Sequence, residues 1–380
     1  MSETSGSGYR GNELATAWRP IVRCEPQVTT LSEADFQSGI AGNLRAERAQ
    51  EASPYGTFEW VALGYLAISS VLIAAFAANL GHPLRLLSVQ ALVAVTIIAL
   101  CRTEANVWDP ISASLGAGDA RTTASAVLRE RDGCPSWTQR FWHFCRHWYP
   151  HLFFLFCFEE LGALVHLVSP RWQDAKLIAM DQWLTGVHPA IWLEQFATPG
   201  RNEFMQFAYM TYFVYLLVLG GILYYREDWH GYWSVMTYSG IAYAIGYVIA
   251  ILFPIESPWF AMAGWWQEPL RGGPFTAAIN FIEHYGRVRG AAFPSEHVAG
   301  SFAALWGAWR HRRWLFWVML PLVLCMCVST VWGRYHYVVD IFGGVVTGTL
   351  GYVIGKWLIR REAGSHRGKA ESVEAASVRQ

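Results

Sequence analysis

Eight stretches of mostly apolar residues, separated by polar segments, occupy most of the chain between residues 60 and 358. A helix needs about 20 such residues to cross a bilayer, so each stretch predicts a transmembrane helix. The predicted spans are Trp60–Asn79, Leu86–Cys101, His147–Val168, Met205–Tyr225, Trp233–Phe253, His297–Trp309, Trp314–Trp332 and Tyr337–Leu358. The third span carries Glu159 and Glu160, and the sixth is short and rich in Ala and Gly.

The pattern predicts an all-α polytopic membrane protein with about eight transmembrane helices. Its predicted parts are a polar N-terminal tail (1–59), two first spans (60–101), a polar loop (102–146), a membrane domain (147–358) and a C-terminal tail (359–380). The N-terminal tail lacks the basic stretch and early apolar core that are typical of a cleaved signal peptide.

Composition supports the membrane prediction and excludes other classes of protein. Hydrophobic residues make up 53 % of the chain and charged residues 15 %, against about 25 % charged in soluble proteins. The 29 basic residues balance the 29 acidic ones, so there is no basic excess that would bind nucleic acid. We therefore expect membrane lipids as the surroundings, and the oligomeric state stays open.

The distribution of basic residues predicts an orientation in the membrane. With both termini in the cytoplasm, 21 of the 29 Lys and Arg residues lie in cytoplasmic segments and 8 in outer ones. Such a bias follows the positive-inside rule, and the short basic turn 310–313 fits it well. The sequence predicts an integral protein of the cell membrane, with segments 169–204, 254–296 and 333–336 on the non-cytoplasmic side.

Two of these outer segments end in histidines that the topology brings together. Residues His297 and His336 are 39 positions apart, which is about the length of two antiparallel membrane helices and a turn. The chain therefore leaves the outer face at His297 and returns to it at His336. Adjacent helices of such a hairpin place the two imidazoles close to each other.

The last span carries a carboxylate and a row of glycines on one face. His336 and Asp340 are four residues apart, so on a helix the carboxylate can accept a hydrogen bond from one ring nitrogen. The other nitrogen is then free to act as a nucleophile or base. The same stripe continues through glycines, which let another membrane helix approach closely. These are Gly344, Gly348, Gly351 and Gly355.

Positive charge stands near both histidines in the sequence. Arg287, Arg289 and Arg334 offer guanidinium groups that match phosphate oxygens two at a time. Ser295 stands just before a predicted helix start, where free backbone N–H groups also bind anions. Together with His297, His336 and Asp340, these residues predict a site for a phosphate ester.

The same residues carry a resemblance to a known family. Arg-Gly-Ala-Ala-Phe-Pro-Ser-Glu-His (289–297) and Ser-Thr-…-His-Tyr-…-Asp (329–340) resemble two signatures of the type-2 phosphatidic acid phosphatase superfamily. Asp-Gln-Trp-Leu-Thr-Gly (181–186) and Phe-Pro-Ile-Glu-Ser-Pro (253–258) are similar to signatures of its inositolphosphotransferase branch, which includes inositolphosphorylceramide synthase. The resemblance covers roughly residues 150–358.

The resemblance implies a fold and a mechanism. Six of the spans would form a lipid-phosphatase-like helical bundle. His336 would attack phosphorus, held by Asp340, and His297 would protonate the leaving oxygen and then activate the acceptor. Arg289 and Ser295, with Arg287 and Arg334 nearby, would bind the phosphoryl oxygens. The substrate would be a lipid phosphate, and the resemblance implies neither cofactor nor metal.

The chain also departs from the phosphatase pattern. Thr330 follows the serine of the third signature where lipid phosphatases have an arginine, and Arg334 is the nearest positive charge. The Lys-x6-Arg-Pro signature of plain lipid phosphatases is missing, since Trp183 stands seven positions after Lys176. These differences favour the phosphotransferase-like branch. They leave open whether the acceptor is water, inositol or another alcohol.

Other interpretations of the polar residues stay open at this point. Glu159 and Glu160 in an apolar segment indicate a substrate contact or a structural support, and the same choice applies to Asp181. The tyrosines of the fourth span, Tyr209 among them, favour packing. Two other functions are alternatives to phosphoryl transfer: a transporter with a proton relay, and an inactive relative that only binds lipid.

Overall fold

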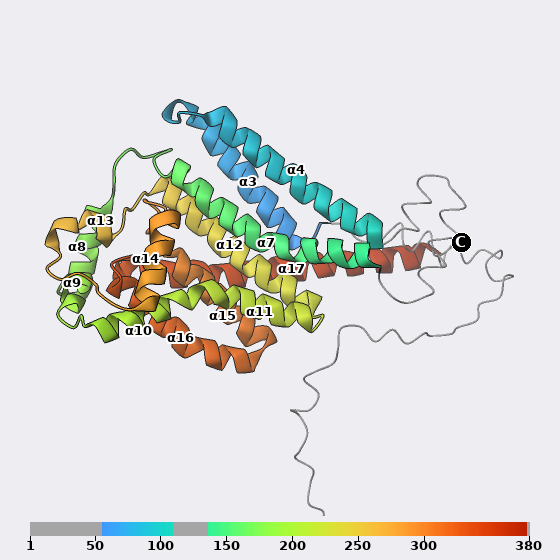
Figure 1. Ribbon diagram of the computed structural model, residues 1–380. Helices are drawn as coiled ribbons and strands as arrows, with labels where there is room; N and C mark the ends of the chain where they lie inside the picture. Colours follow the sequence, from blue (N-terminus) through green and yellow to red (C-terminus); the bar gives the residue numbers. More distant parts are fainter. Residues whose placement is uncertain (1–54, 109–135, 378–380) are drawn as a thin grey trace, which may run out of the picture. The chain divides into compact units, whose positions relative to one another are not determined.

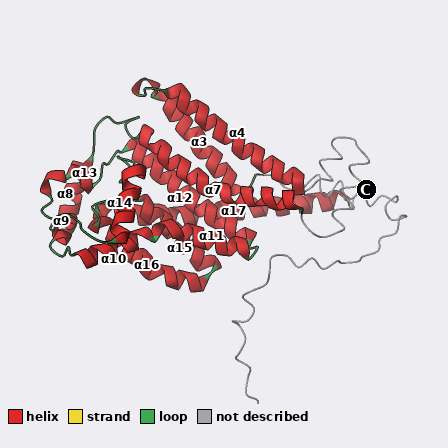
Figure 2. Ribbon diagram, viewed as in Figure 1, coloured by secondary structure: helices red, strands yellow, loops and turns green. Residues whose placement is uncertain are grey.

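The computed structural model describes residues 55–108 and 136–377, and these are almost entirely helical (Figures 1 and 2). The chain divides into two units, Met1–Glu51 with Asn106–Phe141 and Ala52–Ala105 with Trp142–Gln380. The first unit falls largely outside the described residues, together with most of the predicted N-terminal tail and polar loop. The second unit contains every residue discussed below.

Helices account for the whole regular structure of the described ranges, beside one isolated bridge between Ile255 and Ala291. The elements are α3 (Thr57–Ala75), η1 (Ala77–Asn79), α4 (Pro83–Trp108), α7 (Trp137–Leu164), α8 (Asp174–Thr185), α9 (Pro189–Glu194), α10 (Pro199–Met210), α11 (Tyr212–Tyr225), α12 (Trp229–Leu252), α13 (Pro258–Ala261), η2 (Ala263–Trp265), α14 (Pro274–Gly286), α15 (Glu296–His311), α16 (Arg313–Trp332) and α17 (Val338–Ser377). The last helix continues through most of the segment predicted as a C-terminal tail.

Six helical segments of the described chain are long and apolar enough to cross a membrane, so the protein is an all-α polytopic membrane protein. They are Thr57–Ala75, Pro83–Ala105, Pro199–Tyr225, Trp229–Leu252, Arg313–Trp332 and Val338–Ser365. The third and sixth predicted spans are helices that fall outside this set. α15 has 16 residues, about 24 Å, which is shorter than a bilayer core. α7 is long enough, but its sequence includes arginines, histidines and Glu159 and Glu160.

The glycine stripe of α17 packs against two neighbouring helices, as the sequence predicts. A Cβ atom at Gly344 would lie 2.6 Å from the carbonyl oxygen of Ser295, and one at Gly348 would lie 2.5 Å from that of Ala299. Both carbonyls belong to the start of α15. One turn further on, a Cβ at Gly351 would lie 2.4 Å from the carbonyl oxygen of Tyr238 in α12. Only glycine permits these helix axes to approach so closely.

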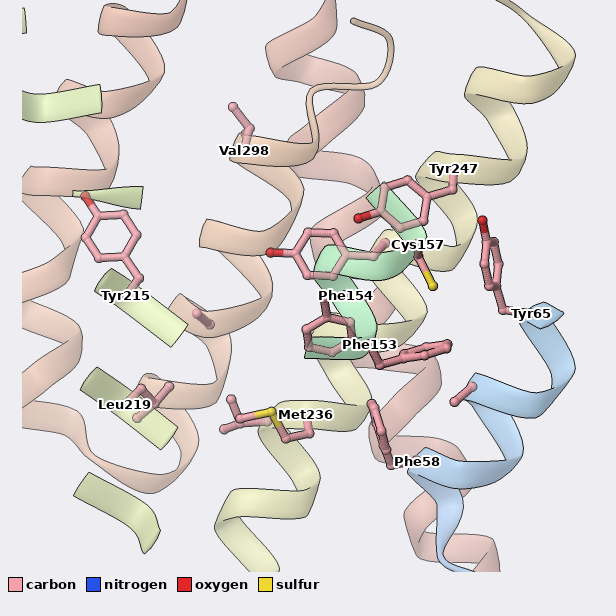
Figure 3. Packing of buried hydrophobic residues seen from close by; sticks show 14 of the residues in the cluster. Phe58, Tyr65, Phe153, Phe154, Cys157, Tyr215, Leu219, Met236, Tyr247 and Val298 are labelled. Atoms are coloured by element: carbon pink, nitrogen blue, oxygen red, sulfur yellow. The ribbon is translucent and has the colours of Figure 1, made fainter. Parts of the chain in front are cut away.

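Helix α3, which precedes the segment that resembles the known family, shares a hydrophobic core with α7 and α12. Phe58 of α3 is buried and packs edge-to-face on Phe154 of α7, with ring centroids 5.8 Å apart (Figure 3). Phe154 in turn packs on Tyr243 of α12 at 5.1 Å. Edge-to-face aromatic pairs of this kind add to the free energy of burial. The first predicted span is therefore part of the bundle.

The predicted outer segments gather at one end of the bundle. Figure 1 shows α8, α9, α13 and α14, which form much of segments 169–204 and 254–296, at the same end. The hairpin of α15 and α16 and the start of α17 reach this end as well. The sequence signatures, which are far apart along the chain, therefore meet here.

Candidate active site

Two histidines from the two ends of the hairpin are in contact. His297 stands in the first turn of α15, and His336 stands in the turn between α16 and α17. The Nδ1 atom of His297 lies 3.1 Å from the Nε2 atom of His336, which confirms the proximity predicted from their spacing. His336 is only 4 % exposed. The pair is therefore shielded from bulk water on most sides.

Local backbone contacts fix the start of α15 beside α17. The Ser295 hydroxyl accepts a hydrogen bond from Val298 N at 3.4 Å and so caps α15. The Ser295 N–H donates to the backbone oxygen of Asp340 at 3.1 Å. Ser295 is fully buried, and its hydroxyl serves its own helix. These bonds hold the first turn of α15, which carries His297, against the first turn of α17.

A tight turn returns the chain from α16 to the site. The backbone oxygen of Thr330 accepts hydrogen bonds from Tyr335 N at 2.9 Å and from His336 N at 3.1 Å. Arg334, inside this turn, has a φ of 65°. Left-handed backbone is uncommon for a residue with a side chain and is found in turns and at functional sites. The buried Thr330 thus shapes the turn, at the position where lipid phosphatases have an arginine.

The surroundings of His336 define which of its nitrogens carries the proton. Nδ1 lies 2.9 Å from the backbone oxygen of Ala292 and 3.4 Å from Oδ2 of Asp340. Carbonyl and carboxylate oxygens accept hydrogen bonds, so Nδ1 is protonated and Nε2 has the lone pair. Burial lowers the pKa of His336 to about 4, and the Ala292 hydrogen bond opposes this shift. The ring is therefore neutral and nucleophilic at neutral pH.

Asp340 holds both the ring and the turn. Its Oδ2 accepts from the backbone N–H of Tyr337 at 2.7 Å, in addition to facing His336. Its Oδ1 is buried without a hydrogen-bond partner among the described residues. The sequence predicts the pairing with the imidazole, and the structure adds the Ala292 carbonyl as a second and closer partner of the same nitrogen.

Asp181 binds the exposed N–H groups at the start of α17. Its two carboxylate oxygens accept from Val338 N and Val339 N, both at 2.9 Å. Burial raises the pKa of Asp181, and the two N–H groups oppose the rise. A carboxylate at a helix N-terminus also interacts favourably with the helix dipole. Of the two interpretations of Asp181, this contact favours structural support.

Asp174 has a similar bridging role that sequence reasoning missed. Its carboxylate accepts from Glu256 N at 2.9 Å, from Ser257 N at 3.2 Å and from the Tyr337 hydroxyl at 2.8 Å. It thus joins α8, the loop before α13 and the turn next to His336. The sequence signal available was an acidic residue at the start of a helix, which by itself indicates only a cap.

Each of the three candidate arginines has an acidic partner. The side chain of Arg287 forms an ion pair with Glu283, one helical turn earlier. Arg289 forms an ion pair with Glu256 and is 57 % exposed. It also lies over the ring of Phe260, with 4.8 Å to the centroid. A phosphate that binds to these guanidinium groups would share them with the carboxylates.

Arg334 is one of the residues that line a cavity next to the turn that carries His336. Its Nη2 donates to the backbone oxygen of Glu268 at 2.7 Å and lies 3.6 Å from a carboxylate oxygen of Glu194. The guanidinium also stacks over Trp266 at 4.2 Å. Burial lowers the pKa of Arg334, and Glu194 opposes this shift. The cavity has a volume of about 390 Å³ and is also lined by Tyr335, the neighbour of His336.

A tyrosine and a glutamate extend the histidine pair on its other side. The Tyr209 hydroxyl lies 2.8 Å from Nε2 of His297 and donates to Oε1 of Glu283 at 3.0 Å. The prediction that Tyr209 serves packing is therefore incomplete, because the Tyr209 hydroxyl is also part of a continuous hydrogen-bonded chain. The chain runs Glu283, Tyr209, His297 and His336. Glu283 lies 74 residues from Tyr209, and no pattern in the sequence links the two.

The structure places the two glutamates of α7 away from the histidine pair. The buried Glu160 accepts a hydrogen bond from Gln90 Nε2 at 3.0 Å, and the same amide donates to Ser69 at 2.8 Å. These bonds join α3, α4 and α7. Glu159 is exposed on the surface of α7. The contacts of Glu160 favour the interpretation as a support of the bundle.

Of the comparisons with known proteins, the one with family models gives a match that contains the candidate site. A family model described as PAP2 superfamily matches residues 175–354. This stretch begins in α8 and ends in α17, so it contains Asp181, His297, His336 and Asp340. Neither the curated proteins nor the solved structures give a match. The match supports the PAP2 superfamily and a phosphatase-type membrane protein, without distinguishing a branch.

Proposed function

We propose that the protein is a membrane enzyme that transfers the phosphoryl group of a lipid phosphate ester to water or to an alcohol. It would resemble the inositolphosphotransferase branch and act at the non-cytoplasmic face. The observation that carries the proposal is the contact of His297 with His336 at 3.1 Å, with the proton of His336 held on Nδ1. The superfamily match and the six membrane-length helices support it.

The proposed reaction has two steps at one phosphorus atom. First, the lone pair of His336 Nε2 forms a bond to phosphorus, and the bond from phosphorus to the lipid oxygen breaks. His297 gives its proton to that oxygen. Second, water or an alcohol gives its proton to His297 and attacks phosphorus, and the phosphorus–nitrogen bond breaks. Splitting the transfer through a covalent phosphohistidine is typical of nucleophilic catalysis. The substrate phosphate would enter between the two rings.

The hydrogen-bonded chain supports the proton-carrying form of His297. Nδ1 of His297 faces the lone pair of His336, so Nδ1 carries a proton. The Tyr209 hydroxyl has one proton, which it donates to Glu283, and its oxygen is then free to accept from His297 Nε2. A proton on each nitrogen of His297 would satisfy every member of this chain, and it would act against burial and the neighbouring His336, which lower the pKa of His297. We infer that Glu283 and Tyr209 position and stabilise His297 as the acid.

The phosphoryl oxygens would be bound at the mouth of the site. Arg289 is the most exposed of the three arginines, so its guanidinium is the one best placed to exchange a carboxylate for a phosphate. Bidentate contacts to phosphate are strong and directional. Arg334 and the cavity that it lines would hold the acceptor or the head group. Ser295 would contribute by fixing the start of α15.

The proposal is tested with the full chain, purified in lipid nanodiscs and given a panel of lipid phosphates with and without inositol or other alcohols. Release of free phosphate indicates hydrolysis, and a phosphorylated alcohol indicates transfer. We expect an acid-labile phosphohistidine in rapidly quenched reactions, absent from the His336→Ala variant. The exposed His284 provides a control, since His284→Ala should leave both signals unchanged.

Full activity of the folded His336→Ala variant would refute the phosphohistidine mechanism. A protein that binds the lipids but turns none over would be an inactive relative. A proton or ion flux that needs no lipid phosphate and is lost in His336→Ala would favour the transporter. These outcomes are distinct, because each is read from a different product.

A further inference from the structure

A cluster of side chains that could bind a metal ion lies apart from the catalytic pair. Glu104 of α4 and His143 and His147 of α7 each direct a ligand atom into one small volume, with these atoms within 4.8 Å of one another. Trp229, the first residue of α12, packs on His143 with ring centroids 4.6 Å apart. The candidate active site lies toward the other end of α12, where Glu296, the neighbour of His297, contacts Gly246. Gly246 is about 25 Å from Trp229 along the helix.

The geometry of this cluster is close to that of a tetrahedral metal site. Glu104 Oε1 lies 3.1 Å from His143 Nδ1. Ligands about 2.0–2.1 Å from a tetrahedral zinc ion lie about 3.4 Å from one another. The Glu104 and His143 atoms have a spacing close to this value. The third ligand atom lies within 4.8 Å of both, so it needs to approach by at most about 1.4 Å. The two histidines are one helical turn apart on the same face of α7.

His147 provides an independent sign that a ligand belongs here. It is 3 % exposed, and its Nε2 atom has no hydrogen-bond partner among the described residues. Its Nδ1 atom lies 2.8 Å from the backbone oxygen of His143, an acceptor, so Nδ1 carries the proton. The buried lone pair of Nε2 is therefore unsatisfied, which costs free energy. A metal-binding histidine usually has this arrangement, with its other N–H on a carbonyl.

Aromatic packing does not satisfy that lone pair. The His147 ring is surrounded by Trp229, Trp233 and Tyr232, with centroids between 4.8 and 5.2 Å away. The Tyr232 hydroxyl is already bound to the backbone oxygen of His147. The rings instead exclude water, as the apolar shell of a metal site does.

The neighbouring arginine would not repel a cation strongly. Arg146 Nη1 lies 2.7 Å from Glu59 Oε1, and both side chains are buried. The Tyr149 hydroxyl donates to the same carboxylate oxygen at 2.6 Å. The guanidinium also stacks over Trp233 at 4.2 Å. Its charge is thus already balanced within the bundle.

We propose that Glu104, His143 and His147 bind one divalent transition-metal ion, with Zn²⁺ the best match to two imidazoles and a carboxylate. Three protein ligands leave the fourth position for a water molecule. The ion would tie α4 to α7, because its ligands come from both helices, and it takes no part in phosphoryl transfer. The matched stretch 175–354 excludes all three residues, so the family match does not account for the site.

The test uses the full chain purified without a polyhistidine tag, freed of metal by a chelator and then titrated with Zn²⁺ or Co²⁺. We expect one bound ion per chain by elemental analysis, the visible absorption of tetrahedral Co²⁺, and a rise in melting temperature with Zn²⁺. Glu104→Gln and His147→Ala should weaken binding at least 10- to 100-fold. His151→Ala, one turn further along α7, is the matched control and should bind as the wild type does.

Two further variants keep the test decisive. Glu104→Gln preserves the size of the side chain, so it separates the loss of a ligand from the loss of packing that His147→Ala entails. His297→Ala should bind metal normally, because the catalytic pair lies at the other end of α12. The proposal is overturned if the wild type binds no ion, or if the double variant Glu104→Gln/His147→Ala binds it as tightly as the wild type.

Discussion

Two pairs of histidines lie at opposite ends of α12, and they differ in how their rings are held. His297 and His336 come from separate segments, and their facing nitrogens are linked into a chain of donors and acceptors that ends at Glu283. His143 and His147 are one turn apart in α7, and the buried Nε2 of His147 has no hydrogen-bond partner among the described residues. A connected chain is suited to moving a proton, whereas an open lone pair is suited to holding an ion.

The largest expected effect is a loss of turnover in His297→Ala, whereas His147→Ala should lose stability. His297→Ala should lower kcat/KM by about 10²–10⁴-fold, because it removes a general acid, while leaving the protein folded. His147→Ala should act on the folded state, so any loss of activity should parallel the loss of folded protein. Turnover and melting temperature, measured on the same samples, check both statements. Equal loss of turnover per folded molecule in the two variants would contradict the comparison.

The next effect tests how the catalytic pair depends on close helix packing. Gly348→Ala would drive a Cβ to 2.5 Å from the Ala299 carbonyl oxygen, forcing α17 away from α15. We expect a loss of about 1–3 kcal/mol in unfolding free energy and reduced turnover. Gly221→Ala is the control, since a Cβ there has no neighbour within 4 Å and alanine favours helices. Denaturation in mixed micelles measures the difference, and equal stabilities would contradict the packing argument.

The sequence predicts the parts of the site that depend on periodicity. The spacing of His297 and His336 and the glycine stripe follow from helix geometry, which repeats regularly along the chain. The contact of His336 with Asp340 is present as predicted, but His336 lies in the turn before α17 and not in the helix. The apolar pattern also predicts the spans, except that α15 is too short and α7 too polar to qualify.

The remaining contacts could not be predicted, because they join irregular segments. Glu283 reaches Tyr209 only because α14 returns over α10, and Ala292 meets His336 through a backbone carbonyl that any residue would supply. Among the carboxylate partners of the arginines, Glu256 lies in a loop without a periodic signal, whereas Glu283 is one helical turn from Arg287. Asp181 is an example. The sequence indicates that this carboxylate has a substrate-binding or structural role, but it does not indicate that the carboxylate accepts hydrogen bonds from two backbone N–H groups of α17.

The third effect concerns pH and uses the lowered pKa of His336, about 4, against about 6.5 for an exposed histidine. The folded state binds this proton less readily than the unfolded state, so the contribution to stability is present above pH 6.5 and is lost as pH falls toward 4. Between pH 7 and pH 5 the wild type should lose about 2 kcal/mol relative to His336→Gln, which has no such proton. A constant difference between the two unfolding free energies across this range would be inconsistent with a buried neutral ring.

The smallest expected effect comes from the hydrogen bonds that link Glu283 and Tyr209 to His297, which the pair His143 and His147 lacks. Tyr209→Phe and Glu283→Gln should each lower kcat/KM about tenfold and move the basic limb of its pH profile to lower pH, because the protonated form of His297 loses support. The double variant should be no worse than about tenfold, since both residues act through one hydrogen bond to His297. Tyr215→Phe, whose hydroxyl bonds to Thr211 instead, is the matched control. Independent, multiplying losses would mean that Tyr209 and Glu283 act separately and that the chain does not carry the proton.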